Sequence, residues 1–529
     1  MVHSADYIIV GAGSAGCVLA GRLSEDPSST VLLIEAGGEP DPRLSDIPGA
    51  ASWMQNTSSD WSFTTTPQRE LFDRKIPYPR GRVVGGTSIL NYVVYVRGNA
   101  GDYDQWAQMG NTGWSYDHVL PYFKKAEANA DIEDEYHGGD GPLSVETNRH
   151  RHPLCELFIE AATSLGVPFN PDFNGATQEG CGYYQATLRN GRRCSSAKAY
   201  LDPARERPNL SLVKNALVTR ILIEKGRAVG VEYIAEGRRL EVARAEREVV
   251  LSAGSIGSPH TMMLSGLGPA DHLKAHGIEV LADLPGVGQN LEDHLGPGSM
   301  TAWVKDPDTI FGEVPASFED AVTEFEKTGG GILATHYLDA GAFFSVNPGE
   351  AYPSCQTFFT PGIAEFYRAD GAPDRGRFCM GGYPCRPKSR GSVTLASANP
   401  LDPPVIDPNY LAEPDDLRVA VEHVKWNRSV LNAKPFESIR EGMAAPETDN
   451  DGELADFVRQ NASTIWHPTS SCRMGNNESD VVGPDLLVHG IEGLSICDAS
   501  VMPTMVSGNT NAPTIMVAEK GADLIKSRA

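Results

Sequence analysis

The chain has 529 residues, a formal net charge of −24 and an isoelectric point near 5.0. This length and a hydrophobic content of 40% are enough for more than one packed domain. The acidic balance argues against a nucleic-acid partner, which needs a basic surface, and against docking on an anionic membrane. No run of about 18 apolar residues is present, so no membrane span is predicted.

The nine cysteines are scattered along the chain, and no two have the CxxC spacing of a redox or zinc motif. Their odd number and their spacing favour reduced thiols and no metal site. The N-terminal residues lead directly into an apolar strand and lack the basic and long apolar segments of a secretory signal. We therefore expect a cytoplasmic protein.

The first residues predict a strand, a glycine turn and a helix in immediate succession. Asp6–Val10 is apolar and β-branched, as expected for a strand covered on both faces, and Cys17–Leu23 has a helical pattern. Between them, Gly11 permits a tight turn, Gly13 lets backbone N–H groups approach a pyrophosphate, and Gly16 lets the helix pack close to the strand. This unit predicts a dinucleotide site at a helix N-terminus.

Glu35 follows a second apolar strand, Thr30–Ile34. An acidic residue about 20 positions after the glycines reads a ribose hydroxyl, and its charge disfavours the 2′-phosphate of NADP. This strand–turn–helix unit does not by itself distinguish an FAD-binding site from an NAD-binding site.

A second glycine cluster, Pro79–Asn91, leads into the apolar stretch Tyr92–Val96. Its glycines favour close approach to a flat or charged ligand rather than a surface turn, because apolar residues flank them. The preceding segment, Ala36–Gln68, is too long for an ordinary connection and predicts a functional loop or lid.

The middle of the chain returns to the nucleotide-binding domain and then changes character. Strands are predicted at Leu210–Val213 and at Glu248–Ser252, the latter followed by a small-residue turn and a helix. From about residue 296 to 455, aromatic residues, prolines and alternating patterns such as Ser392–Leu395 indicate an antiparallel sheet that offers a substrate surface. The predicted fold is α/β (α+β two-domain), with a Rossmann-like nucleotide-binding domain built from residues 1–155, 195–295 and 456–529 and a substrate-binding domain built from residues 156–194 and 296–455.

The C-terminal part carries three tight motifs. His467 is the histidine best suited to remove an alcohol proton, because its ordinary pKa lies near neutrality. Asp498 ends a predicted strand and can lie near the pyrophosphate turn. Asn511 starts the last helix, whose first turn suits Pro513, and a lone asparagine there is more often a cap than a catalytic group.

With these motifs in order, the chain resembles the glucose–methanol–choline (GMC) oxidoreductases, in particular choline dehydrogenase-like and aryl-alcohol or hydroxymethylfurfural oxidase members. The resemblance covers nearly the whole chain. The residues that carry it are the glycine turn with Glu35, the segments Gly81–Asn91, Tyr95–Asn99, Gly286–His294 and Ile465–Gly475, and the segments Cys497–Ser500 and Ser507–Thr514.

The resemblance implies FAD as the cofactor, His467 as the catalytic base and Asn511 as its partner on the substrate oxygen. Leu90 stands where some choline oxidases carry a histidine bonded to FAD, so non-covalent FAD is expected. Val218 is expected to contact the adenine end. The residues expected to bind the cofactor are Gly11, Gly13, Ser14, Gly16, Glu35, Ala36, Arg82, Gly85, Gly86, Thr87, Asn91, Val94, Val218, Ala253, Trp466, Asp498, Ala499, Asn511, Pro513 and Thr514.

The expected reaction is oxidation of a primary alcohol to an aldehyde, with hydride transfer to the flavin and O2 or another molecule as the final electron acceptor. An oxidase acting on aromatic or allylic alcohols is favoured, with Trp466 walling the substrate pocket. The alternative is a choline or other aliphatic alcohol dehydrogenase with a quinone-type acceptor, whose cage would come from residues 311–367. Less favoured are an FAD-containing lyase of the hydroxynitrile type and a light-driven decarboxylase.

Overall fold

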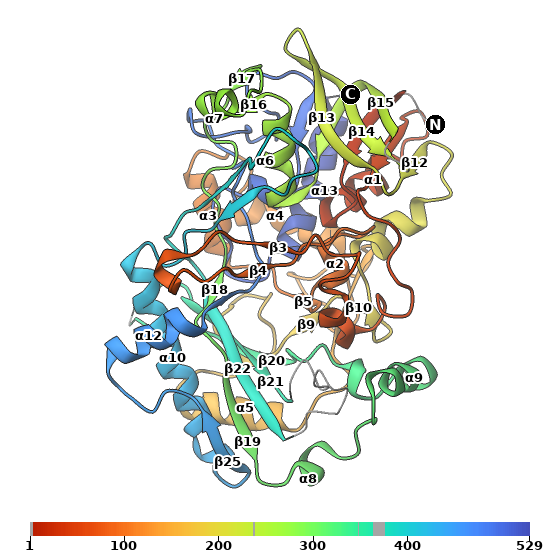
Figure 1. Cartoon of the computed structure of the whole chain (residues 1–529). Helices are drawn as coiled ribbons and strands as arrows, with labels where there is room; N and C mark the ends of the chain where they lie inside the picture. Colours follow the sequence, from red (N-terminus) through yellow and green to blue (C-terminus); the bar gives the residue numbers. More distant parts are fainter. Residues whose placement is uncertain (1–3, 236–238, 348, 363–375, 529) are drawn as a thin grey trace.

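Two sheets organise the molecule, one in the upper half and one in the lower half of Figure 1. The computed structural model describes residues 4–235, 239–347, 349–362 and 376–528. The upper sheet has seven strands and the lower sheet has six. The combination of helices with a largely parallel and an antiparallel sheet confirms the predicted mixed fold class.

The seven-stranded sheet has a parallel core around β1, and its strands follow the order β12-β2-β1-β15-β14-β13, with β27 beside β15. β12, β2, β1, β15 and β27 run parallel, whereas β13 and β14 form an antiparallel extension of β15. The bounds are β1 Ser4–Val10, β2 Val31–Ile34, β12 Leu210–Val213, β13 Leu217–Glu224, β14 Arg227–Ala235, β15 Arg239–Leu251 and β27 Leu494–Ile496.

Helices cover this sheet because β1 and β2 are apolar on both faces and need a partner on each side. α1 (Ser14–Leu23) packs against α13 (Asn511–Ser527), so the first and the last helix of the chain lie side by side. The Arg22 guanidinium of α1 joins the buried Glu519 carboxylate of α13 at 2.8 Å, which ties the chain ends together. α6 (Gly254–Leu264) follows β15 directly.

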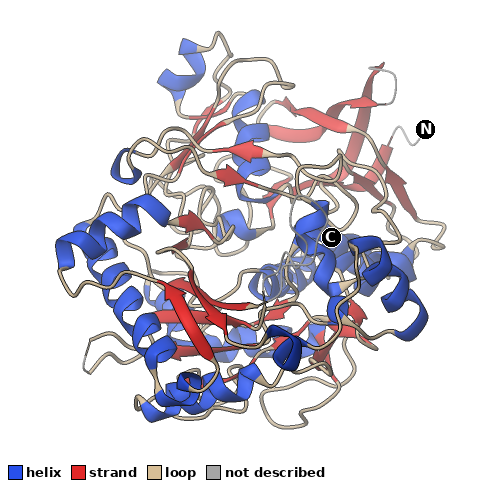
Figure 2. Ribbon diagram, turned by 60° about the horizontal axis from the view of Figure 1, so that its bottom comes forward, coloured by secondary structure: helices blue, strands red, loops and turns tan. Residues whose placement is uncertain are grey.

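The lower sheet is antiparallel throughout, with the strand order β25-β19-β22-β21-β20-β8. α5, α10 and α12 lie along one side of it, and their apolar residues form a second buried cluster with the sheet (Figure 2). The bounds are β8 Gly180–Tyr183, β19 Met300–Val304, β20 Ala340–Phe344, β21 Cys355–Thr360, β22 Arg377–Pro384, β25 Arg440–Ala444, α5 Leu154–Ser164, α10 Pro414–Asn432 and α12 Asp451–Asn461.

Further helices and short strands lie outside these two sheets. They include α2 Thr87–Leu90, β5 Val94–Tyr95, α3 Ala100–Gln108, α4 Tyr116–Ala126, α7 Ala270–Ala275, α8 Pro307–Phe311, α9 Phe318–Thr328, β18 Leu295–Gly296 and β26 Ser463–Thr464. The strand predicted at residues 392–395 is present as β23 (Ser392–Thr394), and it runs antiparallel to β24 (Val405–Asp407). Among the described residues these two strands form a sheet of their own and do not join the six-stranded sheet.

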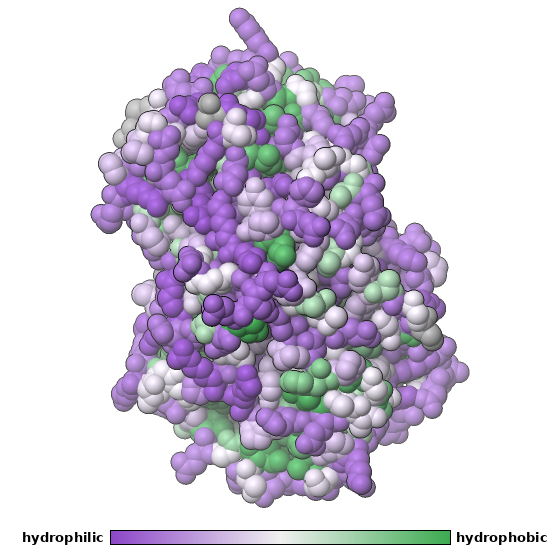
Figure 3. Space-filling view, turned by 180° about the vertical axis from the view of Figure 1, so that it is seen from behind, coloured by the Kyte–Doolittle hydropathy of each residue, from purple (hydrophilic) through white to green (hydrophobic). Residues whose placement is uncertain are grey.

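The surface agrees with the acidic composition. Hydrophobic residues form small separate groups on the face shown in Figure 3, most of which is hydrophilic. None of the described helices is both long and apolar enough to cross a lipid bilayer.

Candidate functional site

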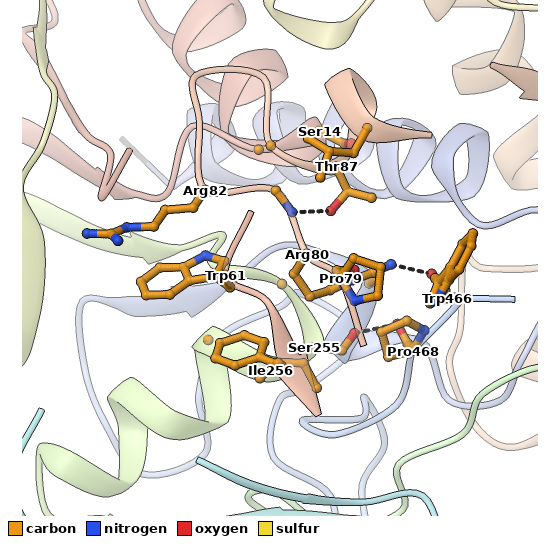
Figure 4. Close-up of a pocket in the computed structure, with 18 of the residues that line it drawn as sticks. Ser14, Trp61, Pro79, Arg80, Arg82, Thr87, Ser255, Ile256, Trp466 and Pro468 are labelled. Atoms are coloured by element: carbon orange, nitrogen blue, oxygen red, sulfur yellow. Dashed lines mark hydrogen bonds between the residues drawn. The ribbon is translucent and has the colours of Figure 1, made fainter. Parts of the chain in front are cut away.

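A long cavity of about 770 Å³ runs between the two sheets and is lined by residues from both. In Figure 4, Trp61 and Arg82 lie toward one end, and Trp466 and Pro468 lie toward the other. Of the residues expected from the sequence, those that line it are Gly11, Gly13, Ser14, Glu35, Ala36, Arg82, Gly86, Thr87, Asn91, Val94, Val218, Ala253, Trp466, His467, Asp498, Ala499, Asn511 and Thr514.

Three of the expected cofactor-binding residues do not line the cavity: Gly16, Gly85 and Pro513. A Cβ added to Gly16 would lie 1.8 Å from the Gly11 carbonyl oxygen, so Gly16 serves close packing of α1 on the turn. The Gly85 N–H donates to the Ala12 carbonyl at 2.7 Å, which joins the two glycine loops. These residues therefore shape the cavity from behind its wall.

The two glycine loops touch each other and leave their backbones bare toward the cavity. A Cβ added to Gly86 would lie 2.6 Å from the Gly13 Cα, whereas one added to Gly13 would meet no atom within 4 Å. α1 starts at Ser14 without a side-chain cap, so its first N–H groups remain available. Bare N–H donors at a helix N-terminus with open space before them suit a diphosphate.

Glu35 joins the first glycine loop to the segment that follows β2, at the cavity wall. Its two carboxylate oxygens accept hydrogen bonds of 2.8 Å from the N–H groups of Ala12 and Gly37. Burial nevertheless raises the pKa of Glu35 to about 7. The carboxyl group is thus held in place beside the turn, where a ribose hydroxyl would meet it.

Asp498 also lines the cavity, and its carboxylate is hydrogen-bonded to other groups of the protein rather than left open toward the cavity. Its carboxylate accepts from the Gly254 N–H at 2.8 Å and from the Ser258 hydroxyl at 2.6 Å, at the start of α6. Burial raises the pKa of Asp498, while these donors oppose that rise. Asp498 therefore fixes the N-terminus of α6 against the strand end.

His467 also lines the cavity, in a segment fixed by buried hydrogen bonds. Its backbone N–H donates to Asp293 at 2.7 Å, and the other Asp293 oxygen accepts from the hydroxyls of Tyr78, Tyr410 and Thr464. The preceding Trp466 has a left-handed backbone (φ +63°), and its carbonyl accepts from Arg80 at 2.6 Å (Figure 4). The segment thus has little freedom to move the imidazole.

His294 sets the tautomer of His467. The two Nδ1 atoms lie 3.0 Å apart, and His294 Nε2 lies 2.9 Å from the Cys385 carbonyl. A carbonyl only accepts, so His294 Nε2 carries a proton; burial lowers the His294 pKa to about 3 and leaves its Nδ1 bare. His467 must therefore donate from Nδ1, and its Nε2 carries the free lone pair.

Asn509, not Asn511, lies beside that lone pair. The Asn509 side-chain nitrogen is 3.4 Å from His467 Nε2, and Asn509 lines the cavity. The Asn511 side-chain oxygen instead accepts from the Ser14 hydroxyl at 2.7 Å, because Asn511 is the first residue of α13 and faces the start of α1. The expectation of Asn511 as the partner of His467 is corrected accordingly.

Sequence reasoning missed Asn509 and assigned no role to the 286–294 motif, although that motif supplies Asp293 and His294. The available signal was the Asn-Thr-Asn spacing, in which either asparagine could precede the helix. The lower sheet and its adjoining loops supply small, polar and apolar residues to the cavity wall, and none of those described is a carboxylate: Ser299, Leu338, Phe358, Thr360, Cys379, Gly381 and Gly382. The loop between β23 and β24 adds the carboxylate of Asp402 to the lining.

Comparison with known proteins identifies the family. The sequence profile of the GMC oxidoreductases matches residues 5–296 with its N-terminal part and residues 387–518 with its C-terminal part. The chain belongs to the GMC oxidoreductases. GMC oxidoreductases depend on FAD and act on alcohols, and the bare backbone of the glycine loops suits the diphosphate of that cofactor.

Three relatives illustrate the range of this GMC family. An alcohol dehydrogenase [acceptor] of Pseudomonas putida is 40% identical over 98% of this chain and 95% of its own length. The mitochondrial choline dehydrogenase of Homo sapiens is 43% identical over 99% of this chain and 90% of its own length. A solved formate oxidase of Aspergillus oryzae RIB40, studied for the effect of a mutation on FAD modification, has a TM-score of 0.91 at 29% identity and covers 100% of this chain and 99% of its own.

Proposed function

We propose that this GMC enzyme oxidises an uncharged primary alcohol to the aldehyde, with His467 as the base and non-covalently held FAD as the hydride acceptor. The observation that carries the proposal is the unprotonated Nε2 of His467, a residue that lines the cavity, with the side-chain nitrogen of Asn509 3.4 Å away. A fixed base and a fixed donor that converge on one point can hold a hydroxyl group in the geometry needed for C–H cleavage.

The residues that would hold FAD are those of the glycine loops, with Glu35 at the ribose and Val218 at the adenine. When bound, FAD supplies an acceptor for the hydride that leaves the carbinol carbon. Leu90 lines the cavity next to Asn91, and its alkyl side chain offers no nucleophile for a bond to the flavin. This supports non-covalent binding.

The chain's own residues carry the proton step. The alcohol hydroxyl donates to His467 Nε2, and its proton is transferred to that atom as the hydride leaves. His467 Nδ1 keeps its own proton, which stays hydrogen-bonded to His294 throughout, so the imidazole gains a positive charge without rotating. The Asn509 amide donates to the substrate oxygen and lowers the cost of the charge that develops there.

The wall of the cavity favours an aromatic or allylic alcohol. Trp466 and Tyr92 stack with ring centroids 6.4 Å apart, and Leu338 and Phe358 also line the cavity. A flat apolar substituent would fit between such side chains. We further propose O2 as the electron acceptor, which makes the enzyme an oxidase.

A choline or other aliphatic alcohol dehydrogenase with a quinone-type acceptor is the second candidate, because several relatives carry the name choline dehydrogenase. A quaternary ammonium needs an aromatic cage and is favoured by a carboxylate. The cage expected within residues 311–367 falls partly outside the described residues, which omit 348 and 363–375.

Anaerobic mixing of the FAD-loaded enzyme with benzyl alcohol, and separately with choline, tests the proposal. Flavin bleaching by benzyl alcohol, followed by rapid recovery in air, is the expected result. Bleaching that persists in air would replace the oxidase by a dehydrogenase, and bleaching by choline alone would replace the substrate class. No bleaching by either would favour the lyase reading.

A further inference from the structure

Asn509 can help catalysis only if its amide faces the reacting oxygen with its NH2 group rather than its carbonyl group. The NH2 group donates to an oxygen that is losing its proton, whereas the carbonyl would repel it. Which end faces the cavity depends on the neighbours of the amide, because the two ends have the same shape.

We propose that Gln356, itself oriented by Tyr184, is the positioning residue that fixes the orientation of the Asn509 amide. Gln356 lies on β21 of the lower sheet and is fully buried. Its side-chain nitrogen lies 3.2 Å from the Asn509 side-chain oxygen and 3.2 Å from the Tyr184 hydroxyl oxygen. The proposal rests on the proposed alcohol oxidation for its functional meaning.

The orientation of Gln356 follows from a backbone carbonyl. The Tyr184 hydroxyl lies 2.8 Å from the Thr357 carbonyl, which only accepts, so the single hydroxyl proton is used there. Toward Gln356, Tyr184 can therefore only accept, and the group facing it must be the Gln356 NH2. The Gln356 oxygen then faces Tyr383, whose hydroxyl donates to it.

This orientation passes to Asn509. Since Gln356 presents its NH2 group, Asn509 must present its oxygen to Gln356 and its own NH2 group to His467. Independently, the Cys385 carbonyl fixes His294 and leaves His467 Nε2 as an acceptor. One chain of hydrogen bonds starts at the Thr357 carbonyl and the other at the Cys385 carbonyl. Both require that Asn509 donates and His467 Nε2 accepts where the two side chains meet.

The test measures anaerobic flavin reduction in Gln356→Met and Tyr184→Phe, alone and combined with Asn509→Ala. In Gln356→Met the Asn509 amide is free to turn, so the rate should fall by about 10- to 100-fold, less than the loss of about 10²- to 10³-fold expected for removing the Asn509 donor itself. In the Asn509→Ala background the Gln356 substitution should have no further effect. Gln68→Met, which removes another buried glutamine, is the control for a general packing loss.

A second measurement needs no substrate. The 15N resonance of His467 Nε2 should move in Gln356→Met in the same direction as in Asn509→Ala, because both lose an oriented NH2 donor. An unchanged resonance, or a Gln356 effect that persists in full without Asn509, would overturn the proposal. If no alcohol reduces the wild-type flavin, the proposed function fails, while the 15N comparison still decides the role of Gln356.

Discussion

Replacing Asn509 and Asn511 one at a time distinguishes the roles that follow from their different contacts. The Asn509 NH2 group lies 3.4 Å from the base nitrogen, whereas the Asn511 oxygen accepts a 2.7 Å bond from Ser14 at the start of α1. Asn509→Ala removes a donor aimed at developing negative charge, which costs about 2.7–4 kcal/mol in the barrier, or about 10²- to 10³-fold in rate.

Asn511→Ala removes one ordinary hydrogen bond, worth about 1 kcal/mol, beside the first glycine loop, where we propose that the diphosphate binds. Its effect should appear mainly as lower FAD occupancy, with the reduction rate of the loaded enzyme changed far less than in Asn509→Ala. The assay is stopped-flow flavin reduction without oxygen at saturating alcohol, normalised to bound FAD. A larger rate loss in Asn511→Ala than in Asn509→Ala would refute the assignment.

Three further predictions follow from buried titratable groups. Burial, with help from His294 and Arg80, holds the pKa of His467 well below its ordinary range, so flavin reduction at saturating alcohol should be constant from about pH 6 to 8; a midpoint near 6.5 would contradict this. Glu35→Ala should weaken FAD binding and so lower the ratio of flavin to protein absorbance. Full FAD occupancy in this variant would contradict the proposed contact between Glu35 and the ribose. Burial lowers the pKa of His423 to about 3, so the folded state loses stability as the pH falls below the unfolded-state pKa of about 6.5. At pH 5 this loss is about 2 kcal/mol relative to pH 8. His423→Leu should therefore show a correspondingly smaller drop in thermal midpoint between pH 8 and pH 5.

The strand, glycine turn and helix at the start of the chain could be predicted from the sequence, because the steric requirements of the turn act on neighbouring residues. Gly11 and Gly16 are five positions apart, and the close approach of the Gly11 carbonyl excludes any side chain at Gly16. The strand before them and the acid at the end of the next strand belong to the same short unit. The spacing of the glycines in the sequence therefore directly reflects the backbone contacts of the turn.

The substrate end could not be predicted in the same way. Asn509 and Asn511 are both polar residues before one helix, and only the direction of each side chain separates them. His294 and Gln356 act through hydrogen bonds to residues 173 and 153 positions away, which no local pattern records. Their roles depend on which atoms carry protons, and that depends on the assembled sheets.

The central claim is that His467 is the base of an alcohol oxidation, and the most direct measurement is anaerobic flavin reduction by benzyl alcohol in wild type and in His467→Ala. Both proteins should be yellow, because the His467 imidazole contacts His294 and Asn509 rather than the glycine loops. The account predicts bleaching in wild type and a rate lower by about 10²- to 10⁴-fold in the variant. Equal rates in the two proteins would contradict it.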